Sequence, residues 1–135
     1  GLRLIVVDAS ALVAIAADEP ERLAFERALD QADTAYVGSV NYLEAGMVLT
    51  SRGYFADIAE LNGWLAELAI DLKEEVELGE GALAAFLKFG RGNHPARLNL
   101  GDCFAYALAK ALDAPLLYKG DGFARTDIRS ALQPT

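Results

Sequence analysis

The sequence RLNLGDCFAYALAKALDAPLLYKGDGF, from Arg97 to Phe123, sets the architecture of this chain. Apolar residues recur at helical spacing after Asp102, so a helix is expected to begin there. A short strand follows at residues 116–118, and Asp121 comes soon after it. Helix, tight turn, strand and acid are half of a parallel α/β unit. Because such folds bind ligands at the carboxyl ends of their strands, both acids are candidate site residues.

Strand and helix signals alternate along the rest of the chain. Apolar runs predict strands at residues 2–7, 34–38 and 69–78, with a last short strand near Ile128. Helical patterns cover residues 9–17, 20–29, 40–52, 54–68 and 81–89, and Ser39 is the expected N-cap of the third. This order predicts an α/β fold, a three-layer α/β/α sandwich around a mostly parallel central sheet.

Composition indicates one soluble domain over residues 1–135. Of these residues 53% are apolar, which is enough for a single core. Cys103 is the only cysteine, so no intramolecular disulfide can form, and a cytoplasmic location is expected. The N-terminal apolar run is too short for a signal peptide or a membrane span, so no membrane partner is expected. The net charge of −8 argues against a broad nucleic-acid-binding surface, but it allows a small acidic site that takes nucleic acid through a metal.

Three aspartates follow predicted strands or begin a predicted helix. Asp8 ends the first strand, Asp102 begins a helix, and Asp121 lies in the sequence Lys-Gly-Asp-Gly. Each has an ordinary structural explanation when taken alone. Asp8 and Asp102 can cap their helices, and Asp121 can be a turn residue.

Glu44 is harder to explain as a structural residue, because its predicted helical stripe should face the core. The members of that stripe are Val40, Glu44, Met47 and Ser51. A buried unpaired carboxylate is so costly that it must find a partner, take up a proton or bind a cation. A salt bridge to Arg52 or Arg97 is the structural alternative.

The four acids together predict a metal site. In a parallel sheet, the exits of two strands and the start of the Asp102 helix share one edge, so the carboxylates converge. Converging carboxylates repel each other unless a divalent cation neutralises them. An all-oxygen set suits Mg²⁺ or Mn²⁺, ions that typically serve phosphate chemistry. A signalling receiver domain is an alternative of another class, although no adjacent acid pair follows the first strand.

Five motifs in order along the chain carry a family resemblance. They are VVDASAL at 6–12, YLEA at 42–45, LNLGDCFAY at 98–106, LLYKG at 116–120 and TDI at 126–128. This set resembles the PIN-domain ribonucleases, and specifically the VapC toxins of type II toxin–antitoxin pairs. The resemblance implies a single PIN-like domain that hydrolyses phosphodiester bonds in structured RNA, often tRNA or ribosomal RNA.

The resemblance also implies roles for particular residues. Asp8, Glu44 and Asp102 would hold one or two Mg²⁺ or Mn²⁺ ions, with Ser10 supporting the first acid. The family is silenced by a cognate antitoxin protein, and homodimers are usual. The family's fourth acid falls at Gly122 of this chain, so either Asp121 replaces it from the neighbouring position or three acids remain. A weakened PIN module that mainly binds RNA or antitoxin is therefore a second alternative, and Asp127 is a further candidate acid.

Basic residues gather in the sequence around the Asp102 and Asp121 segments. The candidates for RNA phosphate contacts are Arg91, His94, Arg97, Lys119 and Arg125. The alternative is a solvated rim that serves solubility. The apolar stripe at residues 54–68 has three open interpretations: core, dimer interface or antitoxin groove.

Overall fold

A parallel sheet, with four strands in the described part of the chain, forms the centre of the molecule. The computed structural model describes residues 2–74 and 76–132. The strands are β1 (Leu4–Val7), β2 (Thr34–Gly38), β3 (Ile70–Lys73) and β4 (Leu116–Leu117), and their order across the sheet is β3-β2-β1-β4. Val6 of β1 pairs with Tyr36 of β2 on one side and with Leu116 of β4 on the other, and every pairing is parallel.

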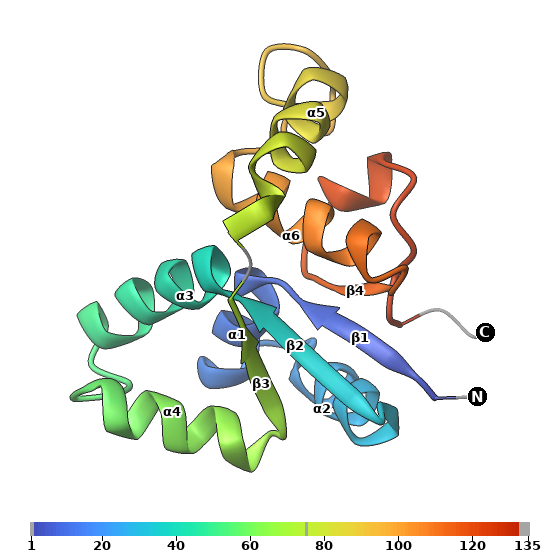
Figure 1. Ribbon diagram of the computed structural model, residues 1–135. Coiled ribbons are helices and arrows are strands. Elements are labelled where there is room, and N and C mark those ends of the chain that lie inside the picture. The colour runs from blue at the N-terminus through green and yellow to red at the C-terminus, as the bar shows by residue number, and fades with distance from the viewer. Residues whose placement is uncertain (1, 75, 133–135) are drawn as a thin grey trace.

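In these described residues, six α-helices and two short 3₁₀-helices connect and cover the strands (Figure 1). The α-helices are α1 (Ala9–Ala16), α2 (Arg22–Gln31), α3 (Ser39–Ser51), α4 (Ile58–Glu67), α5 (Gly79–Phe89) and α6 (Leu100–Ala111). The 3₁₀-helices are η1 (Val76–Leu78) and η2 (Phe123–Arg125).

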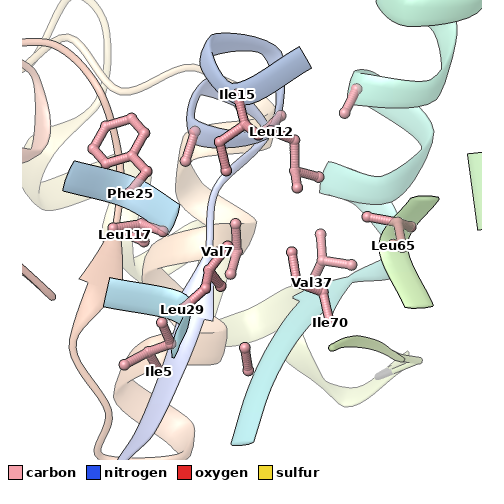
Figure 2. Close-up of a cluster of buried hydrophobic side chains, with 14 of the residues drawn as sticks. Ile5, Val7, Leu12, Ile15, Phe25, Leu29, Val37, Leu65, Ile70 and Leu117 are labelled. Carbon is pink, nitrogen blue, oxygen red and sulfur yellow. The ribbon is translucent and has the colours of Figure 1, made fainter. Parts of the chain in front are cut away.

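Alternate side chains of the strands enter two separate apolar cores. Ile5 and Val7 of β1 pack with residues of α1, α2 and α4, as the close-up in Figure 2 shows. Val6 points to the opposite face and packs with residues of α5 and α6. Because a strand presents successive side chains to opposite faces, this division makes three layers. The predicted α/β/α sandwich is therefore confirmed, and Figure 1 shows α5 and α6 together on one side of the sheet, away from α4.

Two sequence predictions about element ends were wrong. Ser39 is the first residue of α3 rather than its N-cap. The N-cap is Gly38, which has no side chain that could cap the helix. Of the strand expected over residues 69–78, position 75 lies outside the described residues; among the others, β3 covers Ile70–Lys73 and η1 follows at Val76–Leu78. The apolar residues Leu72, Val76 and Leu78 stand two or four residues apart among charged residues, a spacing that fits the two-residue period of a strand, so pattern alone extended the strand too far.

The stripe assigned to the core on α3 was also misplaced. Met47 is 55% exposed and Ser51 is exposed, whereas the buried residues of α3 are Asn41, Ala45 and Leu49. The buried face is rotated from the predicted one because α3 packs against both α1 and α6. Glu44 therefore lies at the margin of the core, half-buried rather than enclosed.

The remaining predictions concern the tail and the 54–68 stripe. Up to residue 132, where the described part of the chain ends, the segment near Ile128 forms one parallel bridge, Leu116 with Ser130, and no strand. In α4, Leu61 and Leu65 belong to the core, whereas Ile58 is 69% exposed. Across residues 2–74 and 76–132, no helix is long and apolar enough to cross a membrane.

Candidate active site

Asp8 lies where β1 ends and α1 begins. Its backbone N–H donates to the Leu117 carbonyl at 2.9 Å and so continues the pairing with β4. The side chain is only 3% exposed and caps α1, since its Oδ2 accepts from the Ser10 N–H at 3.0 Å. The Ser10 hydroxyl donates to the same oxygen at 2.6 Å. Asp8 is thus the cap that its position predicted and also a buried carboxylate at the carboxyl edge of the sheet.

Asp102 reaches the same edge from the first turn of α6. The N-cap of α6 is Asn99, and the two residues form a capping box. The Asp102 N–H donates to Asn99 Oδ1 at 2.9 Å, and the Asn99 N–H donates to Asp102 Oδ2 at 3.1 Å. The capping box holds Asp102 Oδ2 in place and leaves Oδ1 available to a ligand.

Glu44 completes the group from the middle of α3. Its carboxylate lies so close to the Gly101 backbone that a Cβ at that position would come within 2.6 Å of Oε1. Within the described part of the chain, neither Arg52 nor Arg97 lies within ion-pair distance of Glu44, so the salt bridge considered as the structural alternative is absent. The Glu44 carboxylate therefore faces the other acids instead of a basic side chain.

These acids share one pocket of about 530 Å³. The lining residues come from α1 with its N-cap, the connection from α1 to α2, α3 with its C-cap, the start of α6 with its N-cap, and the loop after β4: Asp8, Ala9, Ser10, Val13, Glu19, Glu44, Ala45, Val48, Arg52, Asn99, Asp102, Lys119 and Gly120. Ser10 also ties the β4 loop to the site, because its Oγ accepts from the Lys119 N–H at 3.0 Å. Lys119 Nζ lies 3.1 Å from Glu19 Oε1 and 3.4 Å from Glu21 Oε1.

All three carboxyl groups have pKa values above their ordinary range. Burial raises the pKa of Asp8 to about 7, with smaller contributions from Asp102 and Glu44 and with the Ser10 hydrogen bonds acting in the opposite direction. Burial also raises the pKa of Glu44, and the Asp102 carboxylate adds to this rise. Burial raises the pKa of Asp102 as well. Removing negative charge, by protons or by a cation, is therefore favourable here.

The donor set suits a hard divalent cation. Asp8, Glu44 and Asp102 offer only carboxylate oxygens, the ligands that Mg²⁺ and Mn²⁺ prefer. In residues 2–74 and 76–132, no three Asp, Glu, His or Cys side chains already lie close enough to enclose a metal. An open pocket is compatible with Mg²⁺, because this ion keeps several waters and usually takes one or two carboxylates directly. The residues present therefore fit a partly hydrated Mg²⁺ or Mn²⁺ ion.

Asp121 lies apart from the other acids. It is exposed and is not one of the residues that line the pocket. Its neighbours Lys119 and Gly120 do line it, and Gly120 has a φ of +105°, a conformation that favours glycine. Asp127, the further candidate, accepts from the Tyr106 hydroxyl and from Lys110 Nζ, which gives it a structural role on the α6 side of the molecule.

The predicted RNA-contacting residues are distributed unevenly. Lys119 lines the pocket, whereas Arg91, Arg97 and Arg125 are exposed residues outside its lining. His94 Nδ1 accepts from the Ala96 N–H at 3.0 Å, and its ring packs edge-on against Phe89. His94 therefore orders its own loop and lies outside the pocket lining, which does not suit a general base.

Sequence reasoning assigned no functional role to three residues of this site, and it named Arg52 only as a possible salt-bridge partner of Glu44. Asn41 is a buried polar residue that contacts Asp8, Gly101 provides the close approach to Glu44, and Arg52 lines the pocket. Asn41 carried a usable signal, because it precedes Ala45 and Leu49 at four-residue spacing and so belongs to the buried face of α3. Gly101 carried none, because its role depends on a side chain from another helix.

The fold and the acidic pocket define a class of protein, and similarity to known proteins identifies that class. The family model described as PIN domain matches residues 5–129, and the chain belongs to this family. It is 40% identical to the VapC ribonuclease Mb0640 of Mycobacterium bovis over 130 residues, which cover 96% of this chain and 99% of that protein. It is also 40% identical to the ribonuclease VapC of Mycolicibacterium smegmatis, with 91% and 96% covered. Within the PIN domain family, the chain is therefore a member of the VapC group.

Solved structures support the same fold. The crystal structure of Mycobacterium tuberculosis VapC20, described as a sarcin-ricin loop cleaving toxin, matches with a TM-score of 0.70 at 15% identity. That match covers 92% of this chain and 95% of VapC20. A toxin-antitoxin complex from Klebsiella pneumoniae matches with a TM-score of 0.66 at 14% identity, with 91% and 92% covered. The membership argues against the receiver-domain alternative.

Proposed function

We propose that this chain is an Mg²⁺- or Mn²⁺-dependent endoribonuclease that acts as the toxin of a type II toxin–antitoxin pair. The observation that carries the proposal is the buried Asp8 carboxylate, which shares an open acidic pocket with Glu44 and Asp102. Membership in the VapC group supports RNA as the substrate, since its relatives are named ribonucleases. The proposed substrates are structured RNAs, tRNA or ribosomal RNA.

The acids would hold the ion, and the surrounding residues would fix the acids. A bound divalent ion polarises the scissile phosphate and lowers the pKa of water. Asp8, Glu44 and Asp102 are the proposed ligands, with Asp121 as a proposed outer acid. Ser10 would keep Asp8 in one orientation, because its N–H and its hydroxyl both donate to Oδ2.

Two basic residues in the pocket lining are suited to bind the RNA backbone. Arg52, at the C-cap of α3, lines the pocket together with Lys119. Among the described residues, no carboxylate lies within ion-pair distance of Arg52. Lys119 is already paired with Glu19 and Glu21, so a phosphate must compete for it. An unpaired guanidinium binds a phosphate in two hydrogen bonds, which makes Arg52 the stronger proposed contact. The exposed residues Arg91, Arg97 and Arg125 would extend the contact along the RNA, with His94 beside them.

The proposed protein partners are a cognate antitoxin and a second copy of this chain, in the cytoplasm. Exposed apolar side chains on α5 and at the start of α6 provide surface for such contacts: Leu83, Phe86, Leu87 and Leu100. Apolar patches of this kind usually mark interaction sites. Light scattering of the purified chain, alone and with its antitoxin, measures both associations.

The decisive experiment is cleavage of a mixture of total tRNA and ribosomal RNA by the purified, antitoxin-free protein. Reactions contain Mg²⁺, Mn²⁺ or a chelator, and Asp8→Asn is tested in parallel. We expect discrete fragments that require both the metal and Asp8. Intact RNA in every reaction, with circular dichroism showing folded protein, would contradict the proposal. Metal-dependent cleavage by Asp8→Asn would contradict the assignment of the site.

A second candidate function is a PIN module that binds RNA or antitoxin and cleaves weakly. The exposed position of Asp121, together with glycine at position 122, favours this candidate. The same reactions separate the two candidates when turnover and RNA binding are measured together. Binding without turnover supports the weakened module.

A further inference from the structure

Asn41 is a buried polar side chain that the proposed chemistry does not yet use. It is 2% exposed and lies on the inner face of α3 with Ala45 and Leu49. A buried amide without hydrogen bonds is costly, so its partners must justify its place in the core. Those partners lie 33 and 60 residues away in the sequence.

Both partners of the Asn41 side chain are hydrogen-bond acceptors. Its Nδ2 donates to Asp8 Oδ1 at 3.3 Å and to the Gly101 carbonyl oxygen at 3.1 Å. An NH₂ group has two hydrogens, and here each meets one acceptor. A carboxylate of the same shape at this position would place oxygen against two oxygens. The site therefore requires a donor at position 41.

The first of these bonds completes the anchoring of Asp8. Ser10 donates twice to Oδ2, and Asn41 donates to Oδ1, so each carboxylate oxygen is held by a different part of the chain. A carboxylate held at both oxygens cannot rotate without breaking a buried hydrogen bond. Its remaining lone pairs are therefore presented in a fixed direction.

The second bond fixes the start of α6 against α3. Gly101 immediately precedes Asp102, and the Gly101 backbone is the surface on which the Glu44 carboxylate lies. By holding the Gly101 carbonyl, Asn41 sets the distance between the helices that carry Glu44 and Asp102.

We propose that Asn41 is a positioning residue that links all three acids and thereby sets the affinity of the pocket for a divalent cation. It holds Asp8 directly, Asp102 through the adjoining Gly101 carbonyl, and Glu44 through the spacing of α3 and α6. Residues that orient metal ligands through hydrogen bonds typically change metal affinity by ten- to a hundredfold when they are removed. This inference rests on the proposed function, because it concerns the same metal site.

Calorimetric titration with Mn²⁺, in the absence of RNA, tests this role. Asn41→Ala is compared with the wild type and with Leu49→Ala, a truncation on the same buried face of α3 that lies outside the pocket lining. We expect Asn41→Ala to raise the Kd for Mn²⁺ by ten- to a hundredfold. Leu49→Ala loses stability by leaving a cavity, but its Kd should stay within about twofold of the wild type. Asn41→Ser keeps one donor and should have an intermediate Kd.

The outcomes separate this inference from the proposed function. A wild type that binds no Mn²⁺ overturns both. A wild type that binds Mn²⁺, with Asn41→Ala no weaker than Leu49→Ala, overturns only the role of Asn41. Where Asn41→Ala does not fold, Asn41→Ser provides the comparison, and a Kd equal to that of the wild type overturns the role. Where both fail to fold, Mg²⁺ titration of the wild type monitors the Asn41 side-chain NH₂ signals by NMR, and an absence of any shift overturns it.

Discussion

The exits of β1 and β4 lie side by side at one edge of the sheet, yet the aspartate after β1 is buried and the aspartate after β4 is exposed. Asp8 follows β1 directly, caps α1 and is buried among Ser10 and Asn41. Asp121 follows β4 after Lys119 and Gly120 and is exposed. Where a strand passes directly into a helix, the residue between them stays at the edge of the sheet, as Asp8 does. After β4 a loop that contains glycine follows instead, and its acid, Asp121, lies in solvent. The same topological position therefore does not guarantee the same environment.

The largest expected difference between the two exits is in catalysis. Asp8→Asn should lower the cleavage rate about a thousandfold or more, because a metal site is worth several kcal/mol of transition-state stabilisation. Asp121→Asn removes the same charge from an exposed position and should lower the rate less than about tenfold. Single-turnover rates on one RNA fragment measure both. Equal losses of cleavage rate in Asp8→Asn and Asp121→Asn would show that both aspartates serve the reaction, and would contradict the difference between the two strand exits.

The two exits should also differ in how they couple stability to pH. The pKa of Asp8 is about 7 in the fold and near 3.8 in the unfolded chain, so the folded state binds the proton more tightly. Its stabilising contribution is complete below about pH 4 and is lost as the pH rises through 7. In chelator, the wild type should lose up to about 4 kcal/mol of unfolding free energy between pH 4 and 8 relative to Asp8→Asn.

Urea unfolding at a series of pH values measures this loss. Asp121→Asn is the matched control, since it removes the same formal charge at an exposed site. We expect its pH profile to follow that of the wild type. A wild-type profile that runs parallel to that of Asp8→Asn would mean that Asp8 is not buried in the way described.

A smaller effect, on metal binding, is expected at Gly101, whose backbone lies against the Glu44 carboxylate. Gly101→Ala places a Cβ within 2.6 Å of the Glu44 carboxylate, which must move. Gly63→Ala in α4 meets nothing within 4 Å and should stabilise the protein by about 0.5–1 kcal/mol. We expect Gly101→Ala to weaken Mn²⁺ binding about tenfold while thermal stability changes little. Unchanged binding would show that Glu44 is free to reposition.

The smallest effect is expected from restoring an acid at the β4 exit. A Cβ at Gly122 would lie 3.2 Å from the Ala96 carbonyl oxygen and 3.9 Å from Leu98 Cδ2, neither of which belongs to the pocket lining. Gly122→Asp should therefore change the cleavage rate less than about twofold. A several-fold gain in rate or in Mn²⁺ affinity would show that this exit can supply a fourth acid.

Local sequence signals were enough for the frame of this protein. The apolar runs around Val6 and Val37 and the helical spacing after Asp102 determined the parallel sandwich, because strand and helix periods depend on neighbouring residues. Parallel topology then required the acids at the strand exits and helix starts to approach one edge. Asp8 is the N-cap of α1, whereas the N-cap of α6 is Asn99 and Asp102 takes part in its capping box from the first turn. These capping roles and the functional interpretation do not exclude each other, since a carboxylate that accepts capping hydrogen bonds still presents free lone pairs to a pocket.

Tertiary structure decided the environment of each polar group. The burial of Asn41 depends on Asp8 and Gly101, which are distant in the sequence, and no local pattern contains both. The orientation of Glu44 depends on how closely α3 approaches α6, and the exposure of Asp121 depends on the path of one loop. Sequence alone thus determined which elements form and where the acids gather. Packing between elements decided which carboxylates are buried, held and raised in pKa, because desolvation and hydrogen bonding arise from contacts across the whole fold.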